Sequence, residues 1–266
     1  ATGIGGIVRD IFTMGARPMA CLDPLRFGDP ESPRTRYLFG GVIAGIAGYG
    51  NCLGIPTVGG DIYFDPCYDE NILVNVMCIG IMPKDRLVRG QATGVGNAVV
   101  LLGNRTGRDG IGGASILASQ EFDEKSQEKR PSVQVGDPFT EKLLIEACLE
   151  LLEKGLLVGL QDLGAAGISC ACSETAARGK VGMRIDLEKV PLREEMEPFE
   201  IMISESQERM LAIVEPRNLE EVLEVCRRWG LNAVVIGEVT EGDRLEINWY
   251  GEKVVDVPAP TIANGP

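Results

Sequence analysis

Histidine is absent from this sequence of 266 residues. Its absence excludes acid–base catalysis by imidazole and any zinc or iron site built on histidine. The eight cysteines are scattered, and none form a pair with the Cys-x-x-Cys spacing of a zinc site. We therefore interpret them as small buried thiols in a reducing compartment. Any metal bound by this chain has to be held by oxygen atoms, which favours Mg²⁺ or Ca²⁺.

Basic residues are also scarce. The chain has 26 lysines and arginines against 39 acidic residues, a net charge of −13, and no basic run offsets it. This charge argues against non-specific binding to nucleic acid or to an anionic membrane. The longest apolar run, residues 37–49, is glycine-rich and shorter than the roughly 20 residues that cross a bilayer. Since no charged leader with an apolar segment opens the sequence, we expect a cytoplasmic protein.

The first third of the chain has the pattern of a small α+β unit. Apolar periodicity and start signals predict two helices and three strands, at residues 1–15 and 32–53 and at residues 19–25, 57–64 and 72–81. The second helix contains Gly40, Gly41, Gly45 and Gly48, and each glycine destabilises a helix interior by about 1 kcal/mol relative to alanine. This composition predicts that another backbone packs very close to that helix.

Beyond a linker at residues 84–96 the pattern becomes α/β. Helices are predicted at residues 138–154, 163–178 and 219–229, and strands at residues 98–103, 156–161, 183–187, 210–214 and 233–239. The last stretch, residues 245–257, alternates like a hairpin that turns at Tyr250 and Gly251. We therefore expect two domains, at residues 1–85 and 86–266.

Two motifs place a carboxylate where it can serve a ligand. Arg9 and Asp10 are adjacent on the first predicted helix, and they either face a cleft or form a surface ion pair. Asp162 lies in the segment QDLGAAG, residues 161–167, where a predicted strand gives way to a helix. It either holds Mg²⁺ at the carboxyl edge of a sheet or caps the helix. The residues alone leave both pairs of alternatives open.

Three further segments are candidates for ligand contacts. The glycine-rich segment at residues 103–115 follows a strand and fits either an anion-binding loop or a structural turn, but it matches no nucleotide-binding template. Gln134 lacks a local structural explanation, unlike the helix start at Asp137 beside it. The polar cluster SESQER, residues 204–209, is either a solvated helix end or part of a site.

The net charge bears on how a phosphorylated ligand would be bound. A helix N-terminus favours an anion by about 0.3–2 kcal/mol, and a chain of net charge −13 opposes the approach of any anion. Divalent cations that bridge Asp10 and Asp162 to phosphate would reverse the local sign. Metal-assisted binding is therefore the favoured scheme.

Taken in order, these segments resemble the small-type synthetase subunit of the phosphoribosylformylglycinamidine synthase family. The resemblance covers essentially the whole chain, and its most specific strings are TGRDGIGGAS at residues 106–115, QVGDPF at 134–139, QDLGAAG at 161–167 and ISESQERM at 203–210. Ala166 departs from the pattern, because we expect glycine at that position. At the position of Asp61, glutamate also occurs in this family.

The resemblance implies a partial ferredoxin-like A domain followed by an α/β B domain, the first of two such modules in a longer parent. It also implies an ATP-dependent carbon–nitrogen ligase of purine biosynthesis. Such enzymes convert formylglycinamide ribonucleotide, ATP and glutamine-derived ammonia to formylglycinamidine ribonucleotide, ADP and phosphate. Two alternatives stay open: another ATP-using relative of the aminoimidazole ribonucleotide synthetase, selenophosphate synthetase or thiamine-monophosphate kinase type, or a non-catalytic half of a duplicated protein.

The resemblance also assigns roles to residues. It implies substrate contacts at Arg9, Gln134, Glu205, Ser206 and Gln207, and Mg²⁺ ligands at Asp10 and Asp162. The catalytic histidines of the family are expected upstream of Ala1, so this chain would hold no catalytic residue and be inactive alone. The expected partners are a glutaminase subunit, a small third subunit and the second module.

Overall fold

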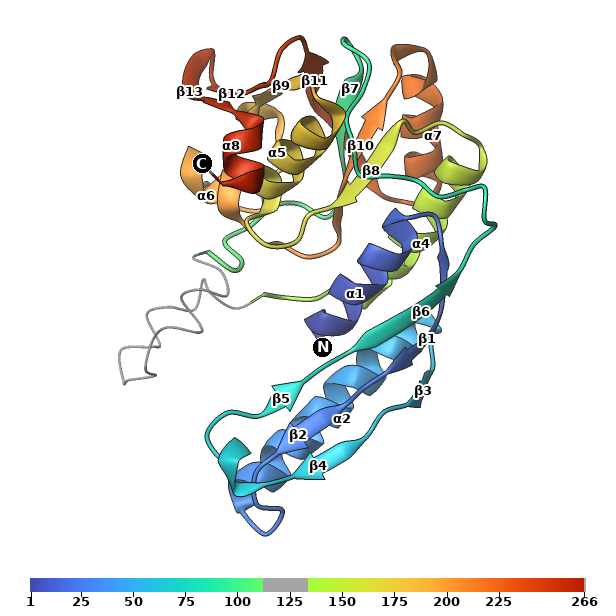
Figure 1. The fold of residues 1–266 in the computed structure, drawn as a ribbon, viewed down its shortest axis with the longest axis vertical. Coiled ribbons are helices and arrows are strands. Elements are labelled where there is room, and N and C mark those ends of the chain that lie inside the picture. Colours follow the sequence, from blue (N-terminus) through green and yellow to red (C-terminus); the bar gives the residue numbers. More distant parts are fainter. Residues whose placement is uncertain (112–133, 266) are drawn as a thin grey trace.

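The computed structural model describes residues 1–111 and 134–265, which form two lobes (Figure 1). The last part of the predicted glycine-rich segment, residues 112–115, lies outside the described residues. The smaller lobe is formed by α1 (Thr2–Thr13), β1 (Arg17–Leu22), β2 (Leu25–Phe27), α2 (Pro33–Leu53), β3 (Thr57–Gly59), β4 (Ile62–Phe64), the 3₁₀ turn η1 (Pro66–Tyr68), β5 (Leu73–Val74) and β6 (Met77–Ile81).

The strands of the smaller lobe form two short sheets placed end to end. Their orders are β3-β1-β6 and β4-β2-β5, and in each the central strand is parallel to one neighbour and antiparallel to the other. The single strand predicted at residues 57–64 is wrong, because the chain breaks at Gly60. This residue has φ of 132°, and a Cβ there would lie 2.4 Å from the carbonyl oxygen of Asp23. The strand predicted at residues 72–81 is likewise divided in two.

Helix α2 corrects a second expectation. Gly40, Gly41, Gly45 and Gly48 do not mark a close backbone packing: among the described residues nothing lies within 4 Å of a Cβ built at Gly40, Gly41 or Gly48, and Gly45 is approached only by Ala1. A Cβ at Gly50, in the last turn of the helix, would lie 3.1 Å from the carbonyl oxygen of Ile55, just beyond the helix end. The glycine-rich side of α2 is instead exposed.

No described helix combines the length and apolar character needed to cross a membrane.

The larger lobe is built on a sheet of seven strands in the order β13-β12-β9-β11-β7-β10-β8. All neighbouring strands are antiparallel except β9 and β12. Its elements are β7 (Ala98–Gly103), α4 (Pro138–Glu153), β8 (Gly159–Asp162), α5 (Gly167–Gly179), β9 (Gly182–Asp186), η3 (Leu187–Lys189), α6 (Pro198–Ile203), β10 (Arg209–Val214), η4 (Pro216–Asn218), α7 (Leu219–Arg228), β11 (Asn232–Thr240), β12 (Arg244–Trp249), β13 (Glu252–Pro258) and α8 (Ala259–Asn264). Sequence periodicity missed the two short helices α6 and α8.

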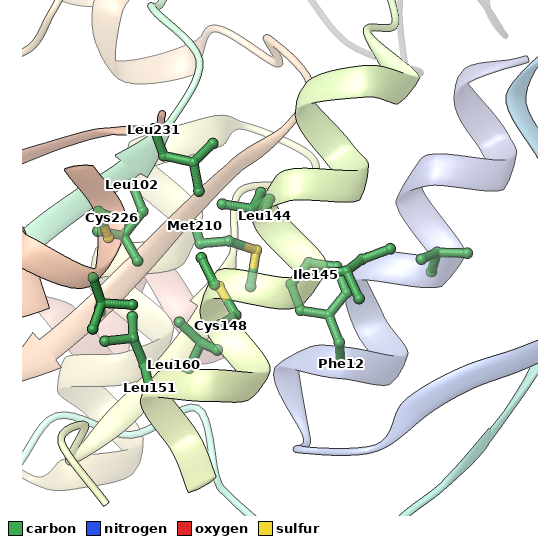
Figure 2. Close-up of a cluster of buried hydrophobic side chains, with 14 of the residues drawn as sticks. Phe12, Leu102, Leu144, Ile145, Cys148, Leu151, Leu160, Met210, Cys226 and Leu231 are labelled. Atoms are coloured by element: carbon green, nitrogen blue, oxygen red, sulfur yellow. The ribbon is translucent and has the colours of Figure 1, made fainter. Parts of the chain in front are cut away.

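The sheet is covered on both faces, because side chains alternate along each strand. On β7, Val100 and Leu102 belong to one core cluster, while Val99 and Leu101 belong to the other. The first cluster takes in α4 and α7 and extends to α1 and α2 of the smaller lobe (Figure 2). The two lobes therefore share one apolar core, with α4 between them.

A polar contact ties the lobes together beside this core. Arg17 on β1 donates two hydrogen bonds, of 2.8 and 2.9 Å, to the carboxylate of Glu146 on α4. These bonds, together with a bond from Lys142, lower the pKa of Glu146 to about 2. Because the folded pKa lies below the unfolded value, the stabilisation is present above about pH 4.5 and is lost as the pH falls towards 2.

Glu146→Gln should therefore lower the free energy of unfolding at pH 7 by only about 0.5–1 kcal/mol, because water screens the half-exposed Arg17. This deficit should shrink between pH 4.5 and pH 3. Urea unfolding across that range measures it, with Glu195→Gln as a control, since Glu195 has no ion pair among the described residues. An equal deficit at every pH would contradict the assignment.

Candidate functional site

A cavity of about 570 Å³ opens where α1 meets the end of β8 and the start of α5. The polar turn between α6 and β10 closes one side of it. Polar residues from all these segments and from Gln134 line the cavity, and they include six of the seven predicted site residues: Arg9, Asp10, Gln134, Asp162, Glu205 and Gln207. The structure therefore brings together residues that are up to 198 positions apart in the sequence.

Arg9 is not part of a surface ion pair, because only 1% of it is exposed. Its guanidinium donates to Glu141 on α4 over 3.1 Å and to Gln207 over 2.7 Å. Glu141 is completely buried, and this burial raises its pKa to about 8 although Arg9 counteracts the rise. Arg9 is thus a cation fixed between the two lobes at the wall of the cavity.

Asp10 and Asp162 face the same cavity, one from α1 and the other from the end of β8. Burial raises the pKa of both carboxyl groups. For Asp162 the pKa rises to about 6, first because of burial and then because of the negative charge of Asp10. Two carboxylates that repel each other in a partly buried cavity are the arrangement that a cation would stabilise.

The donor set fits a hard divalent cation. Both groups offer oxygen, and Mg²⁺ is commonly held by one or two carboxylates while it keeps waters or phosphate oxygens as its other ligands. Within residues 1–111 and 134–265 there is no cluster of three or more acidic or cysteine side chains that would enclose a metal. Asp10 and Asp162 would therefore form an open site that leaves positions for a ligand.

Gln134 and Glu205 are joined across the cavity. The Gln134 amide donates to one carboxylate oxygen of Glu205 over 2.8 Å, and the backbone N–H of Ala166 donates to the other over 3.2 Å. Ala166 has φ of 55°, in the left-handed region where glycine is favoured. This conformation explains why glycine was expected there, and it aims the Ala166 N–H at Glu205.

Ser206 is the exception among the predicted residues. Its side chain is buried and does not line the cavity. It accepts a hydrogen bond from the N–H of Gly107 over 2.9 Å and donates to the carboxylate of Asp109. Its hydroxyl therefore joins the turn to the glycine-rich segment.

The described part of that glycine-rich segment is a structural turn. A Cβ at Gly103 would lie 2.1 Å from the carbonyl oxygen of Glu208, and one at Gly110 would lie 2.7 Å from Cβ of Glu205. The backbone N–H groups of residues 104 and 106–109 already donate to protein oxygens. These five N–H groups are therefore not free to bind an anion.

Sequence reasoning did not show how buried residues support the site, although Glu208 and Arg209 belong to the polar cluster at residues 204–209. Arg209 is fully buried and donates to the carbonyl oxygens of Ser204 and Ser206 over 2.6 and 2.8 Å, which fixes the shape of the turn. Glu208 accepts a hydrogen bond from Tyr49 of α2. Glu141 was detectable, because it shares a helical face with Leu144, Ile145 and Cys148 at the spacing of core residues.

Two family models match the chain. The N-terminal domain of AIR synthase related protein matches residues 1–82, and the C-terminal domain of the same family matches residues 94–250. Among curated relatives, the synthase subunit PurL of Carboxydothermus hydrogenoformans is 61% identical over 259 residues, which are 97% of this chain and 35% of that protein. PurL of Thermoanaerobacter sp. is 60% identical over 99% of this chain. The chain thus spans about a third of these relatives.

Solved structures agree with these matches. Thermotoga maritima PurL complexed with FGAR has a TM-score of 0.90 and 43% identity, and the match covers all of this chain and 42% of that one. The hydrogenase maturation protein HypE of E. coli has a TM-score of 0.74 at 19% identity, which shows the shared fold alone. The expected fold, an A domain of partial ferredoxin-like type followed by an α/β B domain, is confirmed. The chain belongs to the AIR synthase related protein family, and the resemblance of its motifs to the phosphoribosylformylglycinamidine synthase subunit is confirmed.

Proposed function

We propose that this chain contributes the substrate and magnesium side of an ATP-dependent carbon–nitrogen ligase. In this proposal the whole protein converts formylglycinamide ribonucleotide, ATP and ammonia to formylglycinamidine ribonucleotide, ADP and phosphate, in the cytoplasm. The observation that carries the proposal is the shared cavity of Arg9, Asp10, Gln134 and Asp162. Its support is the 60–61% identity to PurL subunits and the similarity to structures of Thermotoga maritima PurL complexed with FGAR and with ATP.

Each residue would act on the substrate in a way that its contacts allow. Arg9 is held by Glu141 and Gln207 and presents a fixed positive charge to the ribonucleotide phosphate or amide oxygens. Gln134 and Glu205, already hydrogen-bonded to each other, offer amide and carboxylate groups to substrate N–H and O–H groups. Ser206 contributes by holding the turn.

Asp10 and Asp162 would hold Mg²⁺, which supplies charge neutralisation for phosphate groups when it is bound. ATP activates the amide oxygen of the substrate by phosphorylation, and ammonia then displaces that phosphate to leave the amidine. Since the chain has no histidine, proton transfer by imidazole has to come from outside these residues. We assign residues 1–85 to the A domain and residues 86–266 to the B domain of this module.

The proposal includes partners. The Thermotoga maritima assembly PurLQS, which contains a PurL chain similar to this one, supports binding to a glutaminase subunit and a small third subunit. A second A and B module in the parent chain agrees with the share of about a third that this chain covers in its relatives. The acidic charge argues against a nucleic-acid partner.

The test uses the full-length protein that contains this chain. It is incubated with ATP, Mg²⁺, ammonium and formylglycinamide ribonucleotide, and both ADP and the amidine are measured by mass spectrometry. We expect ADP and amidine in equal amounts, and neither without the ribonucleotide. ADP formation with aminoimidazole precursors, selenide or thiamine monophosphate in its place would show that the chemistry belongs to another member of the superfamily.

A further inference from the structure

Gln161 lies next to Asp162 and is hydrogen-bonded to it, although consecutive side chains of a strand normally point to opposite faces. Its amide Nε2 donates to Oδ1 of Asp162 over 3.2 Å, while its Oε1 accepts from Arg178 over 3.0 Å. A guanidinium can only donate, so the oxygen of the amide has to face Arg178. The N–H₂ group is thereby left on the side of Asp162.

Arg178 is itself held in place at the end of α5. It donates to Glu174, one helical turn earlier, over 2.6 Å and to the carbonyl oxygen of Gly90 over 3.1 Å. Gly90 belongs to the segment that joins the two lobes. The carboxylate of Glu174 and the carbonyl oxygen of Gly90 thus fix the guanidinium of Arg178, which in turn orients Gln161.

Gly90 also has a steric part in this arrangement. A Cβ at this position would lie 2.3 Å from Oε1 of Gln161 and 3.2 Å from Nη1 of Arg178. Its backbone has no positive φ that would by itself require glycine. The absence of a side chain is therefore needed for the contact between Gln161 and Arg178.

We propose that Gln161, held by Arg178 and Gly90, is a positioning residue that fixes the rotation of the Asp162 carboxylate towards a divalent cation. The proposal rests on the proposed function, because it assumes that Asp162 binds the cation. A hydrogen bond to Oδ1 sets the plane of the carboxylate and with it the direction of the other oxygen. Hydrogen-bond partners of metal ligands typically change metal affinity by about 10–100-fold.

The experiment measures Mn²⁺ binding to the full-length protein from the electron paramagnetic resonance signal of free Mn²⁺. Gln161→Leu removes the donor, and Gly90→Ala displaces Gln161 while every functional side chain is kept. We expect both changes to weaken Mn²⁺ binding about 10-fold. Arg178→Met should weaken it in the same direction. The matched controls are Gly41→Ala, at an open helical glycine, and Arg228→Met, an equally exposed arginine paired with glutamate.

A second readout separates positioning from general damage. In the activity assay the half-saturating Mg²⁺ concentration should rise about 10-fold, while kcat at saturating Mg²⁺ changes less than about threefold. Since Gly90→Ala and Arg178→Met do not remove the amide, they decide the matter if Gln161→Leu fails to fold. Mn²⁺ affinity that stays within about twofold in these variants, but falls with Asp162→Asn, would overturn the positioning role alone. If Asp162→Asn leaves the Mn²⁺ affinity unchanged, the cation site and this proposal are overturned together.

Discussion

Asp162→Asn should lower turnover of the full-length protein by at least about 100-fold, since even indirect partners of metal ligands are worth about 10–100-fold. Asparagine keeps the size and the hydrogen-bonding oxygen but removes the negative charge that a cation requires. Burial and the Asp10 charge raise the pKa of Asp162, so a bound cation would stabilise its ionised form. Steady-state kinetics at several Mg²⁺ concentrations measure the loss, which added Mg²⁺ should restore poorly.

The matched control is Asp186→Asn. Asp186 also lies at the end of a strand of the same sheet, but it is hydrogen-bonded to Lys189 and Asn248 and does not line the cavity. This variant should retain near wild-type turnover. Wild-type turnover in Asp162→Asn would support a purely structural role, that of a strand-end residue before a helix.

The second large effect is expected from Arg9→Met, which should lower the free energy of unfolding by up to about 3–5 kcal/mol at pH 9, where Glu141 is ionised in the wild-type protein, and by less at pH 7. The change leaves the completely buried carboxyl group of Glu141 without the guanidinium that now contacts it. Without Arg9 the pKa of Glu141 rises further above its present value of about 8. Because the pKa of Glu141 is higher in the folded than in the unfolded protein, its contribution to stability is fully present below about pH 4.5. That contribution is lost as the pH rises through the pKa of the folded state.

The double variant Arg9→Met/Glu141→Gln separates stability from ligand binding. A neutral amide in place of the buried acid should restore most of the lost stability and remove its dependence on pH between 5 and 9. Substrate affinity should stay low, because the cation at the cavity wall is still absent. Urea unfolding and a substrate-binding titration measure the two quantities. Recovery of substrate affinity in the double variant would show that Arg9 acts only in folding.

Much of the fold could be predicted because the long amphipathic segments follow local rules. The helix at Pro138–Glu153 begins at a capping Asp137 with proline next to it, and β7 is a continuous apolar run. The errors lie where contacts between distant segments determine the local structure. The break at Gly60 depends on the Asp23 backbone beside it. The exposed glycines of α2 misled the prediction, because the described residues place no close packing partner against them.

The candidate site was predictable in part. The motifs identified Arg9, Asp10, Gln134, Asp162 and the polar turn as candidates, and the fold places all but the Ser206 side chain at one cavity. However, the arginine–aspartate dipeptide alone left a surface ion pair open as an alternative, because burial of Arg9 depends on Glu141, 132 residues away. The roles of the supporting residues were missed for the same reason: they arise from contacts between distant segments.

We propose that Asp10 and Asp162 together hold a divalent cation in this cavity. This binding is tested most directly by diffraction from crystals of the full-length protein with Mn²⁺ and formylglycinamide ribonucleotide, recorded at the manganese absorption edge. We expect an anomalous peak within bonding distance of both carboxylates. A cavity with bound ribonucleotide but no such peak, or manganese held by other residues, would contradict it.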